Sequence, residues 1–285
     1  MTTSESYEFI PVLRSAAELF DVRGRSAVVV GGAGKMGSEF AHVLGAAGAR
    51  VVVLDIDGER AELCAARVEE ETGAETLSLT CDVGDSDEVA VRFRELGARW
   101  GELSILVYVT MAKPPGYYAP TDRYKQETWQ EVIRANLDGA FFCSREATRL
   151  MPHGGSIVFA SSTYAIVGPD PRIYEDCLPG GNVYSPEEPL SLPPSYSAAK
   201  AGLIGLGRHL ATLWSDRKIR VNILIPGGVY DGQEEPFHRA YVSRTPLGRM
   251  AVWSDYNGPL LFLVSDASRY MTGQVLVVDG GWTAW

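Results

Sequence analysis

The segment 27–37, Ala-Val-Val-Val-Gly-Gly-Ala-Gly-Lys-Met-Gly, decides the fold of this chain. An apolar run leads directly into a glycine-rich loop, and Phe40 and Leu44 then follow at helical spacing. Glycines let the backbone turn tightly between a strand and a helix, and free N–H groups at the start of such a helix favour a bound pyrophosphate. The segment therefore predicts a strand, a phosphate-binding turn and a helix. Its predicted contacts with a dinucleotide are Gly31, Gly34, Lys35, Met36 and Gly37.

Further short apolar runs recur along the chain, and helical patterns separate them. Strands that are apolar on both faces and alternate with helices are typical of a parallel sheet that helices cover on both sides. We therefore predict an α/β Rossmann fold, a doubly wound parallel seven-stranded sheet in a single domain over 1–285, with 1–21 as an N-terminal extension. The strands are expected at 27–30, 51–54, 77–79, 105–109, 157–160, 221–225 and 275–278.

Composition and charge restrict the possible functions. The formal net charge is -10, and Lys and Arg form no cluster, so we expect neither a nucleic acid nor a membrane as partner. No apolar run approaches the length of a membrane span, and the first residues do not resemble a leader, which predicts a cytoplasmic protein. The cysteines and histidines have no metal-ligand spacing, so no metal is expected and the thiols are predicted to be reduced.

Acidic residues at the ends of the second and third apolar runs bear on the choice of coenzyme. Asp55 lies where a carboxylate accepts hydrogen bonds from the adenosine ribose and repels a 2′-phosphate, which favours NAD(H) over NADP(H). Lys35 opposes this interpretation, because a cation in the glycine loop could meet a phosphate. Asp82 lies where an adenine would rest, although aspartate is also common in turns. The predicted contacts here are Asp55, Ile56, Asp82 and Val83.

Tyr196 and Lys200 are four residues apart at the start of a predicted helix, so both project from one face. A free phenol with a pKa of about 10 is a poor proton relay at neutral pH, and a nearby cation stabilises the phenolate and lowers that pKa. Only Lys200, of the lysines in this chain, stands four residues after a tyrosine. By spacing alone, an ordinary surface pair remains the alternative.

Taken together, these motifs resemble those of the short-chain dehydrogenase/reductase family, in its single-domain branch, from about residue 22 to the C-terminus. The other shared motifs are Asn-Leu-Asp-Gly at 136–139, Gly-Ser-Ile-Val-Phe-Ala-Ser-Ser at 155–162, Pro-Gly-Gly at 226–228 and Val-Asp-Gly-Gly at 278–281. The resemblance also implies a homotetramer or homodimer, built on the helices that hold Asn136 and Tyr196.

The same resemblance implies a role for each catalytic residue. Tyr196 would be the general acid/base, and Lys200 would bind the nicotinamide ribose and lower the tyrosine pKa. Ser162 would bind the substrate oxygen, and Asn136 would hold a water relay linked to the lysine. The residues that would flank the nicotinamide are Pro226, Gly228 and Val229.

Three departures from the family pattern stand out. Val30 replaces the threonine that usually begins the loop, and the glycine spacing is more usual in the longer, sugar-nucleotide branch. The segment 108–111, Tyr-Val-Thr-Met, replaces the family's Asn-Asn-Ala-Gly, so an amide that normally braces the sheet is missing. A proline-rich insertion, 163–195, separates Ser162 from Tyr196.

The insertion 163–195 joins two predicted catalytic residues, so its middle is expected near the substrate. Its apolar side chains at 166, 167, 190 and 192 are too few to form a separate core, and its polar side chains suit a hydroxyl-rich or anionic ligand. We predict a substrate lid, with a solvated insertion without a role as the alternative. Its expected substrate contacts, together with Ser162, are Tyr164, Arg172 and Tyr184, with Arg172 meeting a phosphate or carboxylate.

The sequence thus predicts an NAD(H)-dependent oxidoreductase that acts on a carbonyl or secondary alcohol of a sugar, sugar phosphate or cyclitol-like molecule. Motifs at 226–233, 244–250 and 280–285 resemble sugar dehydrogenases of the legionaminic-acid type. An epimerase or dehydratase of the same fold, with internally recycled NAD, is one alternative. A non-catalytic NAD-binding regulator is another, but such a protein need not retain the catalytic set. The chain lacks GxSxG and HExxH, and Met36 follows Gly34-Lys35, which excludes hydrolase and kinase motifs.

Overall fold

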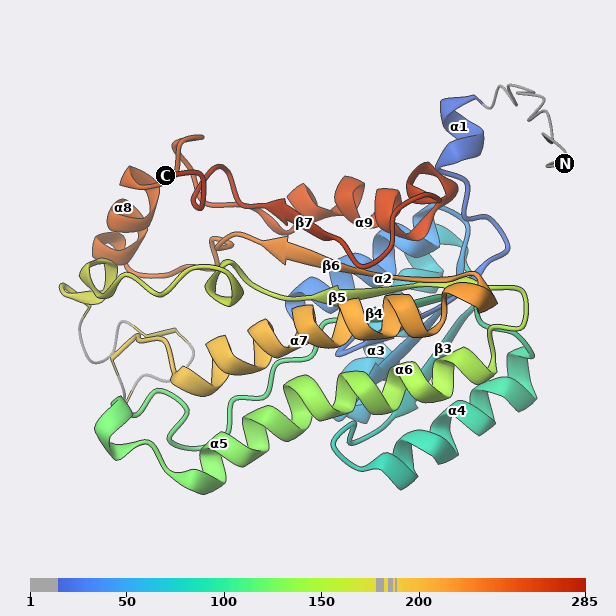
Figure 1. Cartoon of the computed structure of the whole chain (residues 1–285), viewed down its shortest axis with the longest axis horizontal. Helices are drawn as coiled ribbons and strands as arrows, with labels where there is room; N and C mark the ends of the chain where they lie inside the picture. Colours follow the sequence, from blue (N-terminus) through green and yellow to red (C-terminus); the bar gives the residue numbers. More distant parts are fainter. Residues whose placement is uncertain (1–14, 178–181, 184–186, 188) are drawn as a thin grey trace, which may run out of the picture.

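The computed structural model, drawn in Figure 1, describes residues 15–177, 182–183, 187 and 189–285. Its centre is a seven-stranded sheet in the order β3-β2-β1-β4-β5-β6-β7, and every neighbouring pair is parallel. The predicted doubly wound α/β sheet is therefore confirmed. The strands are β1 (Ser26–Val30), β2 (Arg50–Asp55), β3 (Thr76–Thr80), β4 (Ile105–Tyr108), β5 (Gly155–Ala160), β6 (Ile219–Pro226) and β7 (Val275–Val278).

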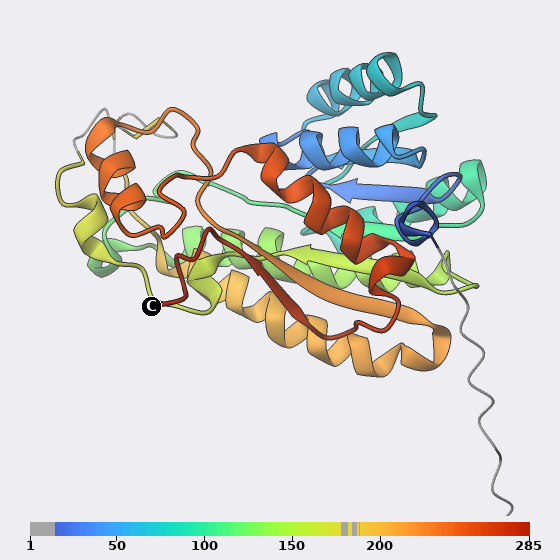
Figure 2. The same ribbon diagram turned by 90° about the horizontal axis from the view of Figure 1, so that it is seen from above.

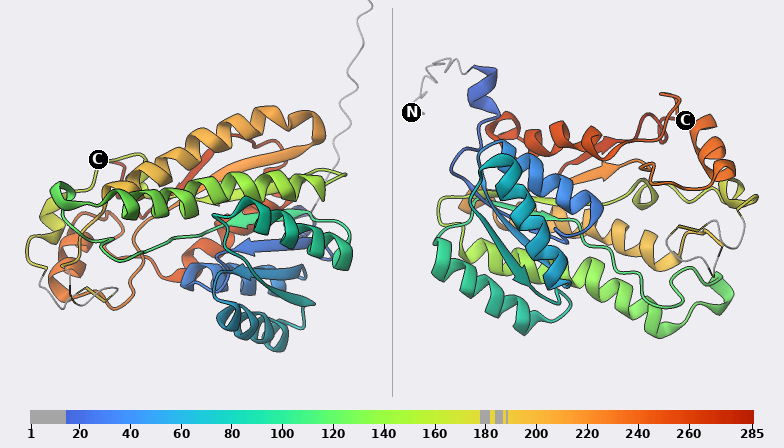
Figure 3. Two further views of the ribbon diagram at one scale, coloured as in Figure 1. Left: turned by 90° about the horizontal axis from the view of Figure 1, so that it is seen from below. Right: turned by 180° about the vertical axis from the view of Figure 1, so that it is seen from behind.

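Helices cover both faces of this sheet (Figures 2 and 3). On one face, α2, α3 and α9 enclose a core that includes Phe40, Val68 and Leu260. On the other face, α4, α6 and α7 enclose a core that includes Phe93, Cys143 and Leu203. The helices are α1 (Ala16–Leu19), α2 (Lys35–Ala46), α3 (Gly58–Thr72), α4 (Ser86–Trp100), α5 (Gln126–Ile133), α6 (Gly139–Arg149), α7 (Pro194–Leu213), α8 (Glu235–Ser243) and α9 (Asn257–Val264).

Strand β1 shows why the apolar runs become central strands. Successive side chains of a strand point to opposite faces, so Val28 and Val30 enter one core while Ala27 and Val29 enter the other. All five residues of β1 are buried, as expected for a strand that is covered on both faces. The sheet order reverses between β1 and β4, and a doubly wound sheet binds its ligands outside the carboxyl ends of the strands at such a switch point.

The described part of the insertion 163–195 packs into a third core. Ile173, Cys177 and Leu190 are buried there with aromatic side chains of α8 and of the C-terminus. Tyr241 and Trp282 stack within it, with ring centroids 4.2 Å apart and an interplanar angle of 12°. Of the insertion's apolar residues singled out in the sequence, only Leu190 belongs to the buried part of this core. The insertion therefore shares a core instead of building one alone.

Two further expectations can be compared with the described residues. Cys64, Cys81, Cys143 and Cys177 are free in the structure, and all four are buried. No described helix is both long enough and apolar enough to cross a membrane.

Candidate active site

The glycine loop between β1 and α2 is shaped by close backbone approaches. Gly31 has a φ of +78°, and a Cβ on it would lie 3.0 Å from the Thr110 backbone. A Cβ on Gly37 would overlap the carbonyl of Gly31. Gly34 is the N-cap of α2 and has no side chain that could accept a hydrogen bond from the first turn of the helix. The helix N-terminus therefore presents backbone N–H groups to the cavity that the loop lines. This cradle fits a pyrophosphate, which needs close backbone approach and no side chain.

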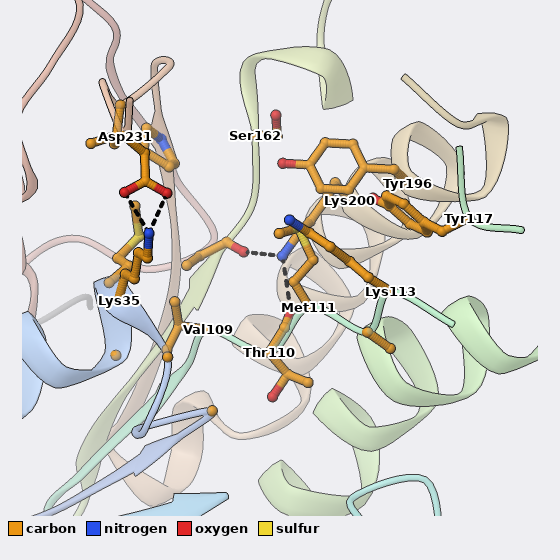
Figure 4. Close-up of a pocket in the computed structure, with 18 of the residues that line it drawn as sticks. Lys35, Val109, Thr110, Met111, Lys113, Tyr117, Ser162, Tyr196, Lys200 and Asp231 are labelled. Carbon is orange, nitrogen blue, oxygen red and sulfur yellow. Dashed lines mark hydrogen bonds and ion pairs between the residues drawn. The ribbon is translucent and has the colours of Figure 1, made fainter. Parts of the chain in front are cut away.

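A cavity of about 730 Å³ opens at the carboxyl ends of the strands. It brings together predicted site residues from every part of the chain, and Figure 4 shows several of them. Two predicted residues do not line it: Asn136, which is fully buried beside it, and Arg172. Tyr184 lies outside the described residues. The predicted residues that line the cavity are Gly31, Gly34, Lys35, Met36, Gly37, Asp55, Ile56, Asp82, Val83, Ser162, Tyr164, Tyr196, Lys200, Pro226, Gly228 and Val229.

Arg172 was expected to bind an anionic substrate group, and the structure corrects this. Its side chain is 72% exposed, and its guanidinium binds the carboxylate of Asp170 at 2.9 Å. Asp170 also pairs with Arg244. Because two guanidinium groups share one carboxylate outside the cavity, Arg172 stabilises the turn of the insertion at Pro171–Tyr174 rather than meeting a ligand.

Asp55 holds together the end of the cavity that the glycine loop lines. Its Oδ2 accepts a hydrogen bond from the backbone N–H of Ala33 at 3.0 Å, and its Oδ1 accepts one from Asp57 at 3.2 Å. Arg60, which also lines the cavity, donates to the carbonyl of Ala33 at 2.7 Å. Ile56 is exposed beside it. The carboxylate therefore fixes the glycine loop against the end of β2 as well as facing the cavity.

Lys35 forms an ion pair that crosses the cavity. Its Nζ lies 2.6 Å from both carboxylate oxygens of Asp231, in the loop that follows β6 (Figure 4). The Asp231 side chain is only 11% exposed. The cation that the sequence offered to a phosphate is therefore already engaged by a carboxylate. Sequence reasoning missed Asp231, because a partner 196 residues away leaves no local pattern.

Lys200 is buried in α7, with 4% of its surface exposed. Its Nζ donates to the carbonyl of Ala160 at 2.9 Å and to that of Thr110 at 3.3 Å, which joins α7 to the ends of β5 and β4. Burial lowers the pKa of Lys200 to about 8, because the charged form is removed from water. The ammonium lies 6.0 Å from the centre of the Tyr196 ring.

Tyr196 and Ser162 point their hydroxyl groups toward one another (Figure 4). Burial raises the pKa of Tyr196, and the influence of the Ser162 hydroxyl only partly opposes this. The expected lowering of the tyrosine pKa by Lys200 is therefore not found in this structure. The physical reason is that surrounding protein atoms remove the phenol from water, which disfavours the charged phenolate.

Asn136 lies in a π-helical turn, Arg134–Asp138, between α5 and α6. Its Oδ1 accepts a hydrogen bond from the backbone N–H of Ala112 at 2.9 Å, while its buried Nδ2 has no protein partner among the described residues. Such turns occur frequently at functional sites, and a buried amide donor without a partner is costly. The donor suits a bound water of the kind that the resemblance implied.

Tyr108 explains how the chain manages without the family's bracing asparagine. Its ring is fully buried and contacts Phe159 edge to face, with centroids 6.4 Å apart. Its hydroxyl donates to the carbonyl of Ala135, the residue before Asn136. A Cβ on Gly139 would collide with that hydroxyl. The phenol thus ties β4 to the π-helical turn, a role for which the sequence offered no account.

The sequence also missed an aromatic wall opposite the glycine loop. It is contributed by the loop after β4, the insertion and α8, and its members line the same cavity. Tyr164 and Tyr174 exchange a hydrogen bond of 3.2 Å within it, and Tyr241 accepts one from the backbone N–H of Gly228 at 2.6 Å. The wall is made of Tyr117, Tyr118, Tyr164, Tyr174, Phe237 and Tyr241.

Comparison with known proteins agrees with this geometry. Residues 25–172 match a family model described as short chain dehydrogenase, and residues 185–283 match one described as Enoyl-(Acyl carrier protein) reductase. A D-arabinitol 2-dehydrogenase of Scheffersomyces stipitis is 29% identical over 93% of this chain and 96% of its own length. A cis-4-hydroxycyclohexanecarboxylate dehydrogenase of Sinomonas cyclohexanicum is 33% identical over 91% and 97%.

A solved structure provides a further comparison. The gluconate 5-dehydrogenase of Burkholderia cenocepacia, in complex with NADP and tartrate, superposes with a TM-score of 0.82 at 27% identity, covering 95% of this chain and 100% of that one. A parallel doubly wound sheet, a glycine cradle and a tyrosine–lysine pair in one cavity define a nicotinamide-dependent oxidoreductase. The chain belongs to the short-chain dehydrogenase/reductase family.

Proposed function

We propose that this protein is an NAD(H)-dependent oxidoreductase that moves a hydride between nicotinamide and a carbonyl or secondary alcohol of a polyhydroxylated small molecule. The observation that carries the proposal is the position of Tyr196 and Ser162 in one cavity with the glycine cradle. Relatives that act on D-arabinitol and gluconate support this substrate class. The legionaminic-acid type of sugar pathway remains a prediction from the C-terminal motifs.

Each catalytic residue has a task at a defined atom. The nicotinamide coenzyme, when bound, supplies or accepts the hydride. Tyr196 gives a proton to the substrate oxygen during reduction and takes it back during oxidation, and the Ser162 hydroxyl holds that oxygen by a hydrogen bond. Lys200 fixes the ends of β4 and β5 and supplies a cation near the phenol. The Nδ2 of Asn136 orients a water that returns protons to the site.

The insertion 163–195 is proposed to select the substrate. Its described residues line the cavity at Tyr164 and Tyr174 and again at 190–193. Because this segment is anchored in the core formed with α8 and the C-terminus, it presents these side chains from a fixed support. A wall of this kind excludes water from the reacting atoms and contacts the apolar C–H faces of a ring or a polyol.

We also propose that the protein is a homodimer or homotetramer built on α5, α6 and α7. Each of these helices leaves a large apolar side chain exposed, namely Trp129, Phe141 and Leu213. A helix face of this kind is commonly covered by a second copy of the chain.

The proposed preference for NAD(H) rests on the charge of Asp55. Asp55→Asn keeps an oxygen that can accept the Ala33 hydrogen bond but removes the negative charge, so it separates charge from structural support. We expect wild-type protein to bind NADH more tightly than NADPH, and the variant to narrow that difference by about tenfold or more. Fluorescence titration of both coenzymes tests this. Tighter binding of NADPH than of NADH by the wild type would contradict the proposed preference for NAD(H). Arg60 and Lys35 would then be the residues that bind the 2′-phosphate.

The reaction class is tested by incubating the protein with NAD⁺ and a panel of polyols, sugar acids and cyclitols while recording NADH. D-arabinitol, D-gluconate and cis-4-hydroxycyclohexanecarboxylate belong in that panel because the names of relatives refer to D-arabinitol, gluconate and cis-4-hydroxycyclohexanecarboxylate. We expect stoichiometric NADH formation with at least one member. Product formation without net NADH would instead indicate an epimerase or dehydratase. Coenzyme binding without any turnover across the panel would favour a regulator.

A further inference from the structure

An ion pair at the edge of the cavity joins two segments that are far apart in the sequence. Lys35 is the first residue of α2, and Asp231 lies in the loop that follows β6. Both side chains line the cavity, and the Nζ of Lys35 lies 2.6 Å from each carboxylate oxygen of Asp231 (Figure 4). The Lys35 side chain is 61% exposed although it lines the cavity, so the pair lies at the boundary between the cavity and solvent.

This ion pair spans the cavity where the middle of a bound dinucleotide is expected. On one side is the glycine cradle at the N-terminus of α2, which fits a pyrophosphate. On the other side is the segment 226–229, which lines the same cavity and is expected to flank the nicotinamide. A coenzyme that extends from Asp55 past the cradle to 226–229 therefore passes beside the pair, which links the two sides of its path.

The loop that carries Asp231 is held in place by contacts other than this ion pair. The backbone N–H of Asp231 donates to the side chain of Gln233 at 2.8 Å, and the Gln233 amide donates to the carbonyl of Val229 at 3.0 Å. Val229 also forms a parallel bridge with Ala251. The carboxylate is thus presented from a fixed support, whereas the Lys35 ammonium is carried on a flexible four-carbon stem. Opening the pair requires a movement of the lysine side chain alone.

The strength of the pair suits a contact that opens and closes. Ion pairs at exposed sites contribute little to stability, because water and salt screen them. The Asp231 side chain is largely buried, however, so its charge loses solvation that the Lys35 ammonium replaces. The closed pair is therefore favoured, yet it can open without any change in α2 or in the loop after β6.

We propose that Lys35 and Asp231 form a clasp across the coenzyme path, and that Asp231 is a positioning residue that slows coenzyme release by holding Lys35. The inference rests on the proposed function, because it concerns the coenzyme site of that enzyme. An ammonium has three N–H donors, and the two oxygens of Asp231 leave one of them for a phosphate oxygen of the coenzyme. Lys35 therefore binds the pyrophosphate without leaving Asp231, and the coenzyme departs only when the clasp opens.

Rates of coenzyme dissociation test the clasp without any turnover. Stopped-flow fluorescence measures the dissociation of NADH, or of NADPH if the wild type binds that coenzyme more tightly. Lys35→Met and Asp231→Asn should each raise the dissociation rate about fivefold, equivalent to ~1 kcal/mol, the upper end of the range for an exposed ion pair. The double variant should show about the same increase as each single variant, because either change alone opens the clasp. Asp231→Glu keeps the carboxylate and should restore the slow dissociation of the wild type.

Asp21→Asn is the matched control, because it breaks an exposed ion pair of the same length, with Arg23 at 2.6 Å, outside the cavity lining. It should leave the dissociation rate unchanged. Slower or unchanged dissociation from Asp231→Asn overturns the proposal, because Asp231 would then compete with the coenzyme for Lys35 or play no part. Effects of the single variants that multiply in the double variant also overturn it, since each residue would then act alone. Failure of the proposed function is separate, because it appears as missing hydride transfer in the turnover panel while these rates remain measurable.

Discussion

Tyr196→Phe is expected to reduce kcat at least ~10²-fold, the usual scale of lost general acid/base catalysis. The variant keeps the ring that packs against the third core, which the insertion shares with α8, and loses only the hydroxyl that faces Ser162. NADH affinity should therefore remain nearly unchanged, because the Tyr196 hydroxyl is the only group near the coenzyme that the variant loses. Steady-state turnover with an active panel substrate, together with fluorescence titration of NADH, measures both quantities.

Tyr164→Phe provides the matched control for this experiment. It removes another half-buried phenol hydroxyl from the same cavity, one that shares a hydrogen bond with Tyr174. We expect a smaller loss of about tenfold or less in kcat, since a neutral hydrogen bond contributes on the order of 1 kcal/mol. A near-normal kcat in Tyr196→Phe, or a larger loss of kcat in Tyr164→Phe than in Tyr196→Phe, would mean that another residue acts as the proton relay.

Lys200→Met is expected to weaken NADH binding and to reduce kcat by at least ~10²-fold, and also to change how stability depends on pH. In the folded protein the pKa of Lys200 is lowered from 10.5 to about 8. Below pH 8 both the folded and the unfolded chain carry the proton, so folding bears the full cost of burying the charge. Between these two values only the unfolded chain keeps the proton, and the stability contributed by this group rises with pH.

The free energy of unfolding of wild type minus that of Lys200→Met should therefore increase between pH 7 and pH 10. At about 1.4 kcal/mol for each pKa unit, the increase is on the order of 2–3 kcal/mol. Urea unfolding at a series of pH values measures this increase. A difference that does not change with pH would mean that the Lys200 ammonium is not buried in the folded protein.

Much of the fold was predictable because it depends on local patterns. Apolar runs predicted all seven strands to within a few residues. The physical reason is strongest for the inner strands such as β1 and β4, which are buried on both faces and therefore apolar throughout. The glycine loop was predictable because the turn after β1 has no room for a Cβ on Gly31 or Gly37. The position of Asp55 was predictable because β2 pairs with β1, so the end of β2 lies beside that turn. Each of these features is determined by residues that lie close together in the sequence.

The parts that the sequence did not predict depend on distant contacts. Asp231 engages Lys35 from the far half of the chain, and Tyr108 reaches the carbonyl of Ala135. Arg172 was misplaced for a related reason. Its side chain could serve a ligand or a neighbouring carboxylate, and Asp170 two residues away was the closer partner. The pKa of Tyr196 also depends on burial, which spacing along a helix does not reveal.

The contact between Tyr108 and Gly139 also constrains the order in which substitutions can be accepted. The phenol occupies the space that a side chain at position 139 would need, so the glycine permits the tyrosine and the tyrosine then forbids any larger residue there. A lineage could acquire Tyr108 only on a background that already held Gly139. Reverting Tyr108 to a smaller residue is sterically open at any time, whereas changing Gly139 first is not. The two substitutions can therefore be accepted in one order only, with Gly139 present before Tyr108 is acquired.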